Sequence, residues 1–412
     1  MKNRMIIKSP FSVFLLVFCC LFFGANLQAQ EQLQEYRQLA GENNPQVQAA
    51  FKEYMAAMEQ VPQVGALPDP TVAFGIFLQS VETRVGAQQF TSSLSQKFPW
   101  FGTLGAKKDA ASQLAKAKYE DFVEAKLKLY REVGITYNEL YFLQKSIGIM
   151  RENLKLLGSF KELARVNFEG GRTGFVSVLR VETEEQEMQD KLLQLRDKKL
   201  PLKAKFEQLL NKSMQQEIAF PDSLQKEQLL YTKEIVLDSV RENSPQLRKL
   251  EFQKNALEEQ EKVAAKSGLP SFSVGVNYIN VAPRSDVEIA DNGKDALMFP
   301  QVGVSIPLYR GKYKAMHREA LLKKEAVSLR KEDATNQLET QVEMLFQKYK
   351  NALRRIELNN RLADISQHSL DLLQTEFSNS QSDFEELLRM ERKVLKYRLE
   401  EEKARVDLYN AV

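Results

Sequence analysis

The side chains that most often carry catalysis are scarce in this chain of 412 residues. It contains two histidines, His317 and His368, and two cysteines, Cys19 and Cys20, which both lie in an apolar run near the N-terminus. Neither a Gly-x-Ser-x-Gly nucleophile motif nor a His-x-x-x-His zinc pair occurs. We therefore expect that the protein is not an enzyme, that it has no catalytic residue and that it binds no cofactor.

Two groups of methionines suggest copper, because soft thioether ligands suit Cu(I). Met316 precedes His317, and Met55 and Met58 share a helical face. Methionines at helical spacing serve more often as adaptable packing side chains. We therefore predict no metal site and place both histidines on helix surfaces.

The segment "GGRTG" at residues 170–174 has the composition of a phosphate-binding loop. A loop of that kind follows a strand and ends in Lys-Ser or Lys-Thr, and this segment does neither. Gly170, Gly171 and Gly174 instead predict a reversal between two helices, because glycine adopts positive φ at low cost.

A second segment, residues 377–384, reads "FSNSQSDF" and contains no glycine. Three carboxylates, Asp383, Glu385 and Glu386, lie within one helical turn of its end. They could stabilise the N-terminus of the following helix through its dipole. They could also attract cations, if several copies of the chain meet on one axis. Both roles can hold together.

The first 29 residues predict a secretory signal peptide. Lys2, Arg4 and Lys8 precede an apolar run over residues 11–23, which is too short to span a bilayer, and small or polar residues follow up to Ala29. Removal of this segment lowers the 58 basic residues to 55, equal to the 55 acidic residues, and removes both cysteines. The exported chain is therefore expected to lack disulfides, and its balanced charge does not suggest a nucleic-acid partner.

The rest of the chain is predicted to be a tandem duplication. Four landmarks of the first half recur in the same order in the second: "NPQV" at 44–47 as "SPQL" at 244–247, "LPDPTVAFGI" at 67–76 as "LPSFSVGVNY" at 269–278, "FPWFG" at 98–102 as "IPLYRG" at 306–311, and Phe168, Phe175 and Leu179 as Phe377, Phe384 and Leu388.

Each half is expected to contain a helix, a β-hairpin, a long helix, a turn and a return helix. After the signal peptide at 1–29, the first repeat is expected at 30–230 and the second at 231–412. The first has a hairpin at 70–98, a long helix at 104–168, a turn at 169–175, a return helix at 175–211 and a linker. The second has a hairpin at 270–308, a long helix at 312–377, a turn at 378–383 and a return helix at 384–412.

Caps and heptads support these helices. Asn44 and Ser244 are predicted N-caps, each followed by a proline in the first turn. The long helices lack proline and carry apolar stripes at coiled-coil spacing, so each needs a partner, which its return helix can supply. The stripes are Leu140, Leu143, Ile147, Met150, Leu154 and Leu157 in the first, and Val342, Phe346, Tyr349, Leu353 and Ile356 in the second.

The four predicted strands alternate apolar residues with small or polar ones. Strands of about ten residues match tilted membrane-spanning strands, and Phe98, Trp100 and Phe101 at a strand end are typical of an interfacial belt. The alternative is a half-buried sheet of a soluble protein. The set that we predict to face lipid is Val72, Phe74, Ile76, Leu78, Leu94, Phe272, Val274, Val276, Tyr278, Val302, Val304 and Ile306.

Four strands cannot stand alone in lipid, because the backbone groups at the sheet edges would lack hydrogen-bond partners. Other copies of the chain must close the sheet. Two copies would give eight strands, whose interior side chains fill the barrel, whereas three copies would give twelve strands and an interior wide enough to conduct.

These features resemble the TolC-like outer membrane efflux proteins over essentially the whole exported chain. The resemblance implies a mostly helical fold in which long coiled-coil helices form a periplasmic α-barrel, and four strands per copy contribute to the twelve-stranded β-barrel of a homotrimer. It is carried by the paired "NPQV" and "SPQL" and by "LPDPTVAFGIF", "LSQKFPWFGTLGAKKDAA", "VGVSIPLYRGKYKAMHREA", "FEGGRTGFVSVL" and "FSNSQSDFEELL".

The resemblance also implies roles for the two turns. Gly171 matches a glycine of the periplasmic tip, where adaptors dock, and Phe168 matches an aromatic residue before it. Glu386 matches an acidic position at the closed entrance, but Arg389 stands where a second acid is expected. The expected docking residues are Phe168, Gly170, Gly171, Arg172, Gly174, Gln381 and Ser382. The expected entrance residues are Phe377, Ser380, Asp383, Glu386 and Arg389.

Proteins of this family are passive export ducts. The implied location is the outer membrane of a Gram-negative bacterium, with a large periplasmic portion. The implied partners are other copies of the chain, a periplasmic adaptor, an inner-membrane pump and outer membrane lipid, and the expected cargo is metal ions or small toxic compounds. The alternative is a soluble periplasmic coiled-coil or adaptor protein, which would lack four lipid-facing strands.

Overall fold

The structure is a computed structural model that describes residues 32–214, 218–224, 229–286, 288–378 and 384–412. The predicted signal peptide at 1–29 lies outside the described residues. The chain forms two compact units. The first, which we call the coil unit, comprises Met1–Gln48, Ala125–Val240 and Gln337–Val412, and the second, the sheet unit, comprises Ala49–Glu124 and Arg241–Asn336.

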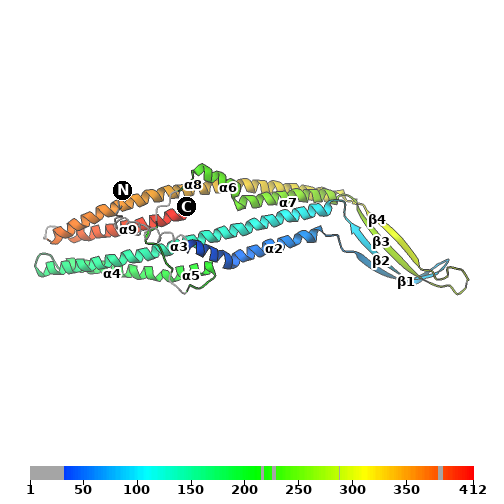
Figure 1. Cartoon of the computed structure of the whole chain (residues 1–412), viewed down its shortest axis with the longest axis horizontal. Helices are drawn as coiled ribbons and strands as arrows, with labels where there is room; N and C mark the ends of the chain where they lie inside the picture. Colours follow the sequence, from blue (N-terminus) through cyan, green and yellow to red (C-terminus); the bar gives the residue numbers. More distant parts are fainter. Residues whose placement is uncertain (1–31, 215–217, 225–228, 287, 379–383) are drawn as a thin grey trace, which may run out of the picture. The chain divides into compact units, whose positions relative to one another are not determined.

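Long helices and one antiparallel sheet make up the described chain (Figure 1). In chain order the elements are α2 (Pro45–Gly65), β1 (Thr71–Thr83), β2 (Gly86–Phe98), α3 (Thr103–Glu169), α4 (Val176–Asp197), α5 (Lys199–Leu210), α6 (Lys233–Asn243), α7 (Pro245–Ser267), β3 (Ser271–Ala282), β4 (Ala296–Ser305), α8 (Arg310–Ser378) and α9 (Phe384–Ala411).

The same order of elements appears twice. Each half also has a short helix that the sequence patterns did not reveal, at residues 32–43 in the first and α6 in the second. Both helices are short, and α6 buries none of its residues, whereas the helix at 32–43 buries Tyr36 and Ala40. Within the described ranges, no helix is both long and apolar enough to cross a membrane.

One of the two predicted N-caps forms. The Asn44 Oδ1 atom accepts hydrogen bonds from the backbone amides of Gln46 and Val47, at 3.0 and 3.4 Å, at the start of α2. Ser244 has the extended backbone of an N-cap but makes no side-chain capping bond. The common feature of the two helix starts is therefore the proline at the first helical position, which needs no amide partner.

The coil unit is held together by the predicted heptad stripes. Five of the six residues of the first stripe are buried. Four of these five, Leu143, Ile147, Met150 and Leu157, pack with apolar residues of α4, α8 and α9. In the second stripe, Ile356 packs with Ala352 of α8 and with Ala404 and Leu408 of α9. The return helices thus supply the coiled-coil partners that the long helices require.

The return helix of the first repeat is broken, contrary to the prediction of one helix at 175–211. It divides into α4 and α5 at Lys198. The cause is Pro201, which has no backbone N–H to donate to the carbonyl of Asp197 and whose ring crowds that carbonyl.

The sheet lies within the sheet unit and has the strand order β1-β2-β3-β4. The two hairpins are joined by antiparallel pairing of β2 with β3, so the halves of the duplication share one sheet. Among the described residues, β1 and β4 each have one neighbouring strand and leave one edge unpaired.

Candidate functional site

The first of the two connections between long helices, at residues 169–175, has near its start a glycine in the left-handed conformation that ends α3. Gly171 has φ +69°, its amide donates to the Phe168 carbonyl at 2.9 Å, and the Arg172 amide donates to the Asn167 carbonyl at 2.8 Å. This bonding is the Schellman ending of a helix. Among the three glycines of the segment, only Gly171 needs positive φ; Gly170 and Gly174 do not adopt it.

Matching aromatic pairs flank the two turns, but their burial differs. The ring centroids of Phe168 and Phe175 lie 5.2 Å apart, and those of Phe377 and Phe384 lie 4.8 Å apart. The first pair is 41% and 50% exposed, whereas the second is 1% and 2% exposed. The first turn therefore presents an apolar surface to its surroundings.

Phe377 was expected among the residues of the closed entrance, and its side chain packs in the core of the coil unit. The heptad stripe of α8 continues to this residue, so its position on the helix directs the ring toward α9. The other expected residues of this turn, Ser380, Gln381, Ser382 and Asp383, lie outside the described residues.

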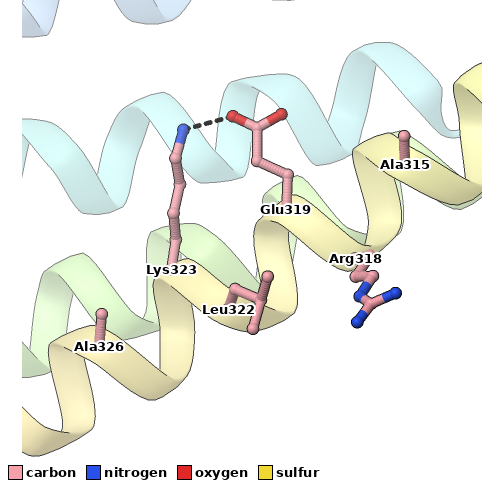
Figure 2. Close-up of a pocket in the computed structure, with 6 residues that line it drawn as sticks. All are labelled: Ala315, Arg318, Glu319, Leu322, Lys323 and Ala326. Atoms are coloured by element: carbon pink, nitrogen blue, oxygen red, sulfur yellow. Dashed lines mark hydrogen bonds and ion pairs between the residues drawn. The ribbon is translucent and has the colours of Figure 1, made fainter.

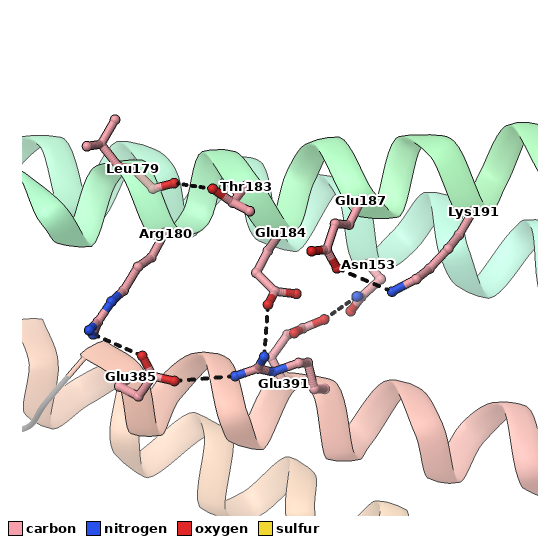
Figure 3. Close-up of polar contacts among 10 residues, drawn as sticks. Asn153, Leu179, Arg180, Thr183, Glu184, Glu187, Lys191, Glu385 and Glu391 are labelled. Carbon is pink, nitrogen blue, oxygen red and sulfur yellow. Dashed lines mark hydrogen bonds and ion pairs between the residues drawn. The ribbon is translucent and has the colours of Figure 1, made fainter.

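Glu386 and Arg389 form an ion pair with each other on one face of α9. Arg389, which stands where a second acid was expected, therefore neutralises the charge of Glu386. The neighbouring Glu385 binds Arg180 of α4 at 2.9 Å, as Figure 3 shows. It also binds Arg392 at 3.5 Å. The acids at the start of α9 thus pair with arginines, and their placement also suits the helix dipole.

The strand register gathers the predicted lipid-facing residues on one face of the sheet. Val72 pairs with Leu94 and Leu94 with Val276, while Val274 pairs with Val302. Residues paired directly across antiparallel strands point to the same side. On β1 this face is open: Phe74 and Ile76 are each 80% exposed. Leu78, at 98% exposed, lies where the β1 register shifts, and Ile306 follows the end of β4.

The opposite face is small and polar. Ser93 pairs with Asn277 and Ser273 with Gly303, and the Thr91 hydroxyl donates to the Asn277 side-chain oxygen at 2.7 Å. One end of the sheet carries aromatic rings, with Trp100 stacked on Phe272 at 5.9 Å between centroids. The sheet therefore has one apolar face, one polar face and an aromatic end.

A comparison with protein families identifies this architecture. Residues 36–212 and 236–412 each match the family described as outer membrane efflux protein. The chain belongs to the outer membrane efflux protein family. The two matched segments correspond to the two halves of the duplication.

Solved structures share the fold of this efflux family member at low sequence identity. The outer-membrane channel OprN superposes with a TM-score of 0.78 at 16% identity, covering 92% of this chain and 88% of the other. The outer membrane protein VceC from Vibrio cholerae gives 0.73 at 15% identity, covering 93% and 95%. CusC gives 0.74 at 16% identity, covering 92% of each. No curated protein matches the sequence.

Family membership places the chain among transport channels, which are not enzymes. His317, one of the two histidines, bonds through its Nε2 atom to Glu261 at 3.2 Å and so links α8 to α7. In the part of the chain that the structure describes, no group of three metal-binding side chains comes together.

One buried carboxylate was not predicted from the sequence. Glu391 of α9 is charged in its usual form, yet it is 0% exposed and lies among the residues of an apolar cluster. Its Oε1 atom accepts a hydrogen bond from Asn153 of α3 (Figure 3). Its Oε2 atom has no hydrogen-bond partner among the described residues. A heptad count would have flagged it, because Glu391 lies one turn from the core residues Leu387, Leu388 and Val394.

Burial raises the pKa of the Glu391 carboxyl to about 7, against the lowering effect of the Asn153 hydrogen bond. The charge of Glu184 on α4 also raises this pKa, whereas Arg392 and Lys191 lower it. Glu391 is therefore a titratable group near neutral pH in the packing between α3, α4 and α9.

We expect Gly171→Ala to destabilise the protein by about 1 kcal/mol, because an L-residue in the left-handed conformation crowds its own carbonyl. The matched control is Gly174→Ala, since that glycine lacks positive φ and a Cβ there meets nothing within 4 Å. Thermal unfolding followed by circular dichroism compares the two. Equal effects would contradict the role of Gly171.

We expect the stability of the protein to fall as pH rises from about 4.5 to about 7, because the folded state resists ionisation of Glu391 in this window. The contribution lost by the top of the window is about 3 kcal/mol. Glu391→Gln should remove this dependence and be the more stable protein at pH above 7. Exposed Glu385→Gln is the control. Melting temperatures measured across pH report the result. If Glu385→Gln removed the pH dependence of stability as much as Glu391→Gln, the assignment to Glu391 would be refuted.

Proposed function

We propose that the protein is the outer membrane duct of a tripartite efflux system, in which three copies form a twelve-stranded β-barrel and a periplasmic α-barrel. The observation that carries this proposal is the sheet: four antiparallel strands with one predominantly apolar face, and edge strands that each have one side unpaired among the described residues. Residues Phe74, Ile76 and Val302 on this face are 80%, 80% and 63% exposed, as lipid contact requires.

The unpaired edges support closure by other copies. In hydrocarbon, the amides and carbonyls on the outer sides of β1 and β4 would lack partners, so β4 of one copy must pair with β1 of the next. The small and polar residues of the other face would then line a wet interior.

The helices also carry apolar stripes without a partner in their own copy. On α8, Leu358, Ile365 and Leu372 recur at seven-residue spacing and are 52%, 63% and 66% exposed. In the coil unit, Leu179 and Leu193 of α4 are likewise about half exposed, at 48% and 54%. Heptad stripes of this kind bury their side chains against other helices, which fits a barrel of helices from several copies.

A similar surface occurs on α8 within the sheet unit. Figure 2 shows a shallow depression beside which Glu319 and Lys323 form an ion pair at 2.6 Å. Leu322 lies in it and is 55% exposed. The depression is lined by Ala315, Ala326 and residues between them that share one face of the helix. A helix of a neighbouring copy could therefore approach closely there.

The exposed aromatic pair Phe168 and Phe175 supports adaptor docking at the first turn. An adaptor residue of apolar character would cover these rings, together with Val176, which is 59% exposed. Family membership supports an outer membrane location and a periplasmic adaptor and inner-membrane pump as partners. The cargo, metal ions or small toxic compounds, rests on the family resemblance alone.

The soluble coiled-coil or adaptor alternative finds no support in the sheet. A soluble protein would cover the apolar face with helices, and here Phe74 and Ile76 remain exposed within the sheet unit.

Fractionation and planar-bilayer recording test the proposal. The protein should partition with detergent-extracted outer membranes, run as a heat-modifiable trimer and form stable pores in bilayers. Recovery in a soluble periplasmic extract without pore formation would exclude the duct.

The two faces of the sheet should tolerate charge differently. We expect Val274→Lys to reduce the assembled trimer, and Val304→Lys, nearer the aromatic end, to reduce it less, because a lysine on the lipid face costs roughly 2–4 kcal/mol at the bilayer midplane and about 0–1 kcal/mol near the interfaces. The matched controls, Ser273→Lys and Ser305→Lys, place the same charge on the polar face of adjacent positions. Heat-modifiable trimer in membranes, quantified by gel, reports the result. Equal losses on both faces would contradict the orientation.

The ion pair between Glu386 and Arg389 predicts opposite effects of removing each partner. Glu386→Ala should leave unpaired guanidinium groups and shift selectivity toward anions, whereas Arg389→Ala should expose carboxylates and shift it toward cations. Reversal potentials in asymmetric salt measure both, and Glu357→Ala, which breaks an exposed pair with Arg361, is the control. If neither variant moves the reversal potential, Glu386 does not line the pathway and serves the helix dipole.

A further inference from the structure

The aromatic end of the sheet is where four helix ends meet. Thr71 pairs with Ser95, Phe98 with Phe272 and Ser271 with Ser305. The starts of β1 and β3 therefore lie beside the ends of β2 and β4. Because only short segments join these strands to α2, α3, α7 and α8, those helix ends gather at this end of the sheet unit.

Close contacts tie the helix ends together. A Cβ added to Gly65 would lie 3.5 Å from the Cβ of Lys108, and one added to Gly268 would lie 3.4 Å from the Cβ of Tyr313. The ammonium group of Lys266 lies against Gly102. These contacts bring basic residues of separate elements into one zone.

The two segments that leave the sheet, residues 97–108 and 306–318, contain seven Lys or Arg residues and no acid. All seven are exposed, and within the described chain none forms an ion pair. The nearest acids in sequence follow these segments directly, Asp109 after Lys108 and Glu319 after Arg318, and Glu319 pairs with Lys323. We call this set the basic collar: Lys97, Lys107, Lys108, Arg310, Lys312, Lys314 and Arg318.

Helix stability does not account for the basic collar. Neither α3 nor α8 has an acidic residue in its first turn, and cations near a helix N-terminus oppose the helix dipole. Both halves nevertheless place lysines in the first two turns of their long helix, Lys107 and Lys108 in α3 and Lys312 and Lys314 in α8. Basic residues placed against the helix dipole at the start of both long helices point to a function outside the helices.

The apolar side of the collar indicates the partner. Phe101, Leu308 and Tyr309 lie between the sheet and the collar and are 80%, 77% and 85% exposed. Exposed aromatic rings beside a lipid-facing sheet mark the membrane interface, and long basic side chains next to them extend their charges to the headgroups. Uncompensated positive charge at that depth complements anionic phosphate.

We propose that the basic collar binds the headgroups of anionic phospholipids in the leaflet nearest the helices and thereby fixes the depth of the protein in the membrane. This inference rests on the proposed function for the membrane position of the sheet, and it adds a specific lipid class as a partner.

The test is a native mass-spectrometry titration of the purified full-length protein in detergent with phosphatidylglycerol or phosphatidylethanolamine. The chain as it stands should retain phosphatidylglycerol preferentially, and added salt should weaken this retention. A variant with Lys107, Lys108, Lys312 and Lys314 all changed to Gln should lose the preference, with affinity for phosphatidylglycerol reduced about tenfold or more.

The matched control changes four exposed lysines of the coil unit to Gln: Lys155, Lys348, Lys393 and Lys396. This control removes the same positive charge as the collar variant, and it should still retain phosphatidylglycerol in preference to phosphatidylethanolamine. Loss in both variants, or equal retention of the two lipids by the unmodified chain, would overturn the proposal. Full competition by inorganic phosphate would show that the collar binds free phosphate instead, and would overturn it as well.

The same preparations distinguish this inference from the proposed function. Each protein is also inserted into liposomes and run as a trimer on gels. Failure of the unmodified chain to insert would reject the channel itself. Insertion as a trimer without any phosphatidylglycerol preference would reject only the lipid site.

Discussion

The backbone groups on the outer edges of β1 and β4 impose the strongest constraint on this protein. A four-stranded sheet with an apolar face satisfies its hydrogen bonds in oil only when another strand pairs with each edge. Among the described residues, no further strand pairs with these edges, so the proposed membrane position of the sheet calls for strands from other copies. The exposed heptads of α4 and α8 extend the same requirement to the helices. In the proposed channel, these exposed apolar side chains would be covered by other copies, by lipid or by an adaptor.

The two halves of the duplication have diverged where their helices turn. Equivalent phenylalanines form an exposed pair at the first turn and a buried pair beside the second. The first turn relies on left-handed Gly171, whereas the second half places Glu391 in its core against Asn153. One turn is therefore suited to contact a partner, and the other is sensitive to the packing and ionisation of its own helices.

Periodicity carried much of the fold prediction. Alternation along residues 71–78 and 271–278 identified strands and their faces, and the heptads of the long helices identified their partners, because both patterns reflect which side chains must leave water. Pro201 was a visible signal for the break between α4 and α5 that the prediction overlooked. The site was harder to predict. The burial of Phe377 follows the stripe of α8, and Glu386 pairs with Arg389 at i,i+3 spacing on one helix, so the sequence carried both signals. The ion pair of Glu385 with Arg180 instead depends on how α9 is rotated against α4, which a local pattern does not determine.

Chemical cross-linking between the two edges of the sheet tests the central claim most directly. Thr71 of β1 and Gln301 of β4 lie at the same level across the sheet, through the pairs with Ser95 and Gly275. A variant with cysteines at both positions, and none elsewhere in the exported chain, would be treated in membranes with flexible bismaleimides. Closure by neighbouring copies predicts dimer and trimer bands and nothing larger. A protein that inserts stably in liposomes yet yields only monomer would contradict the account.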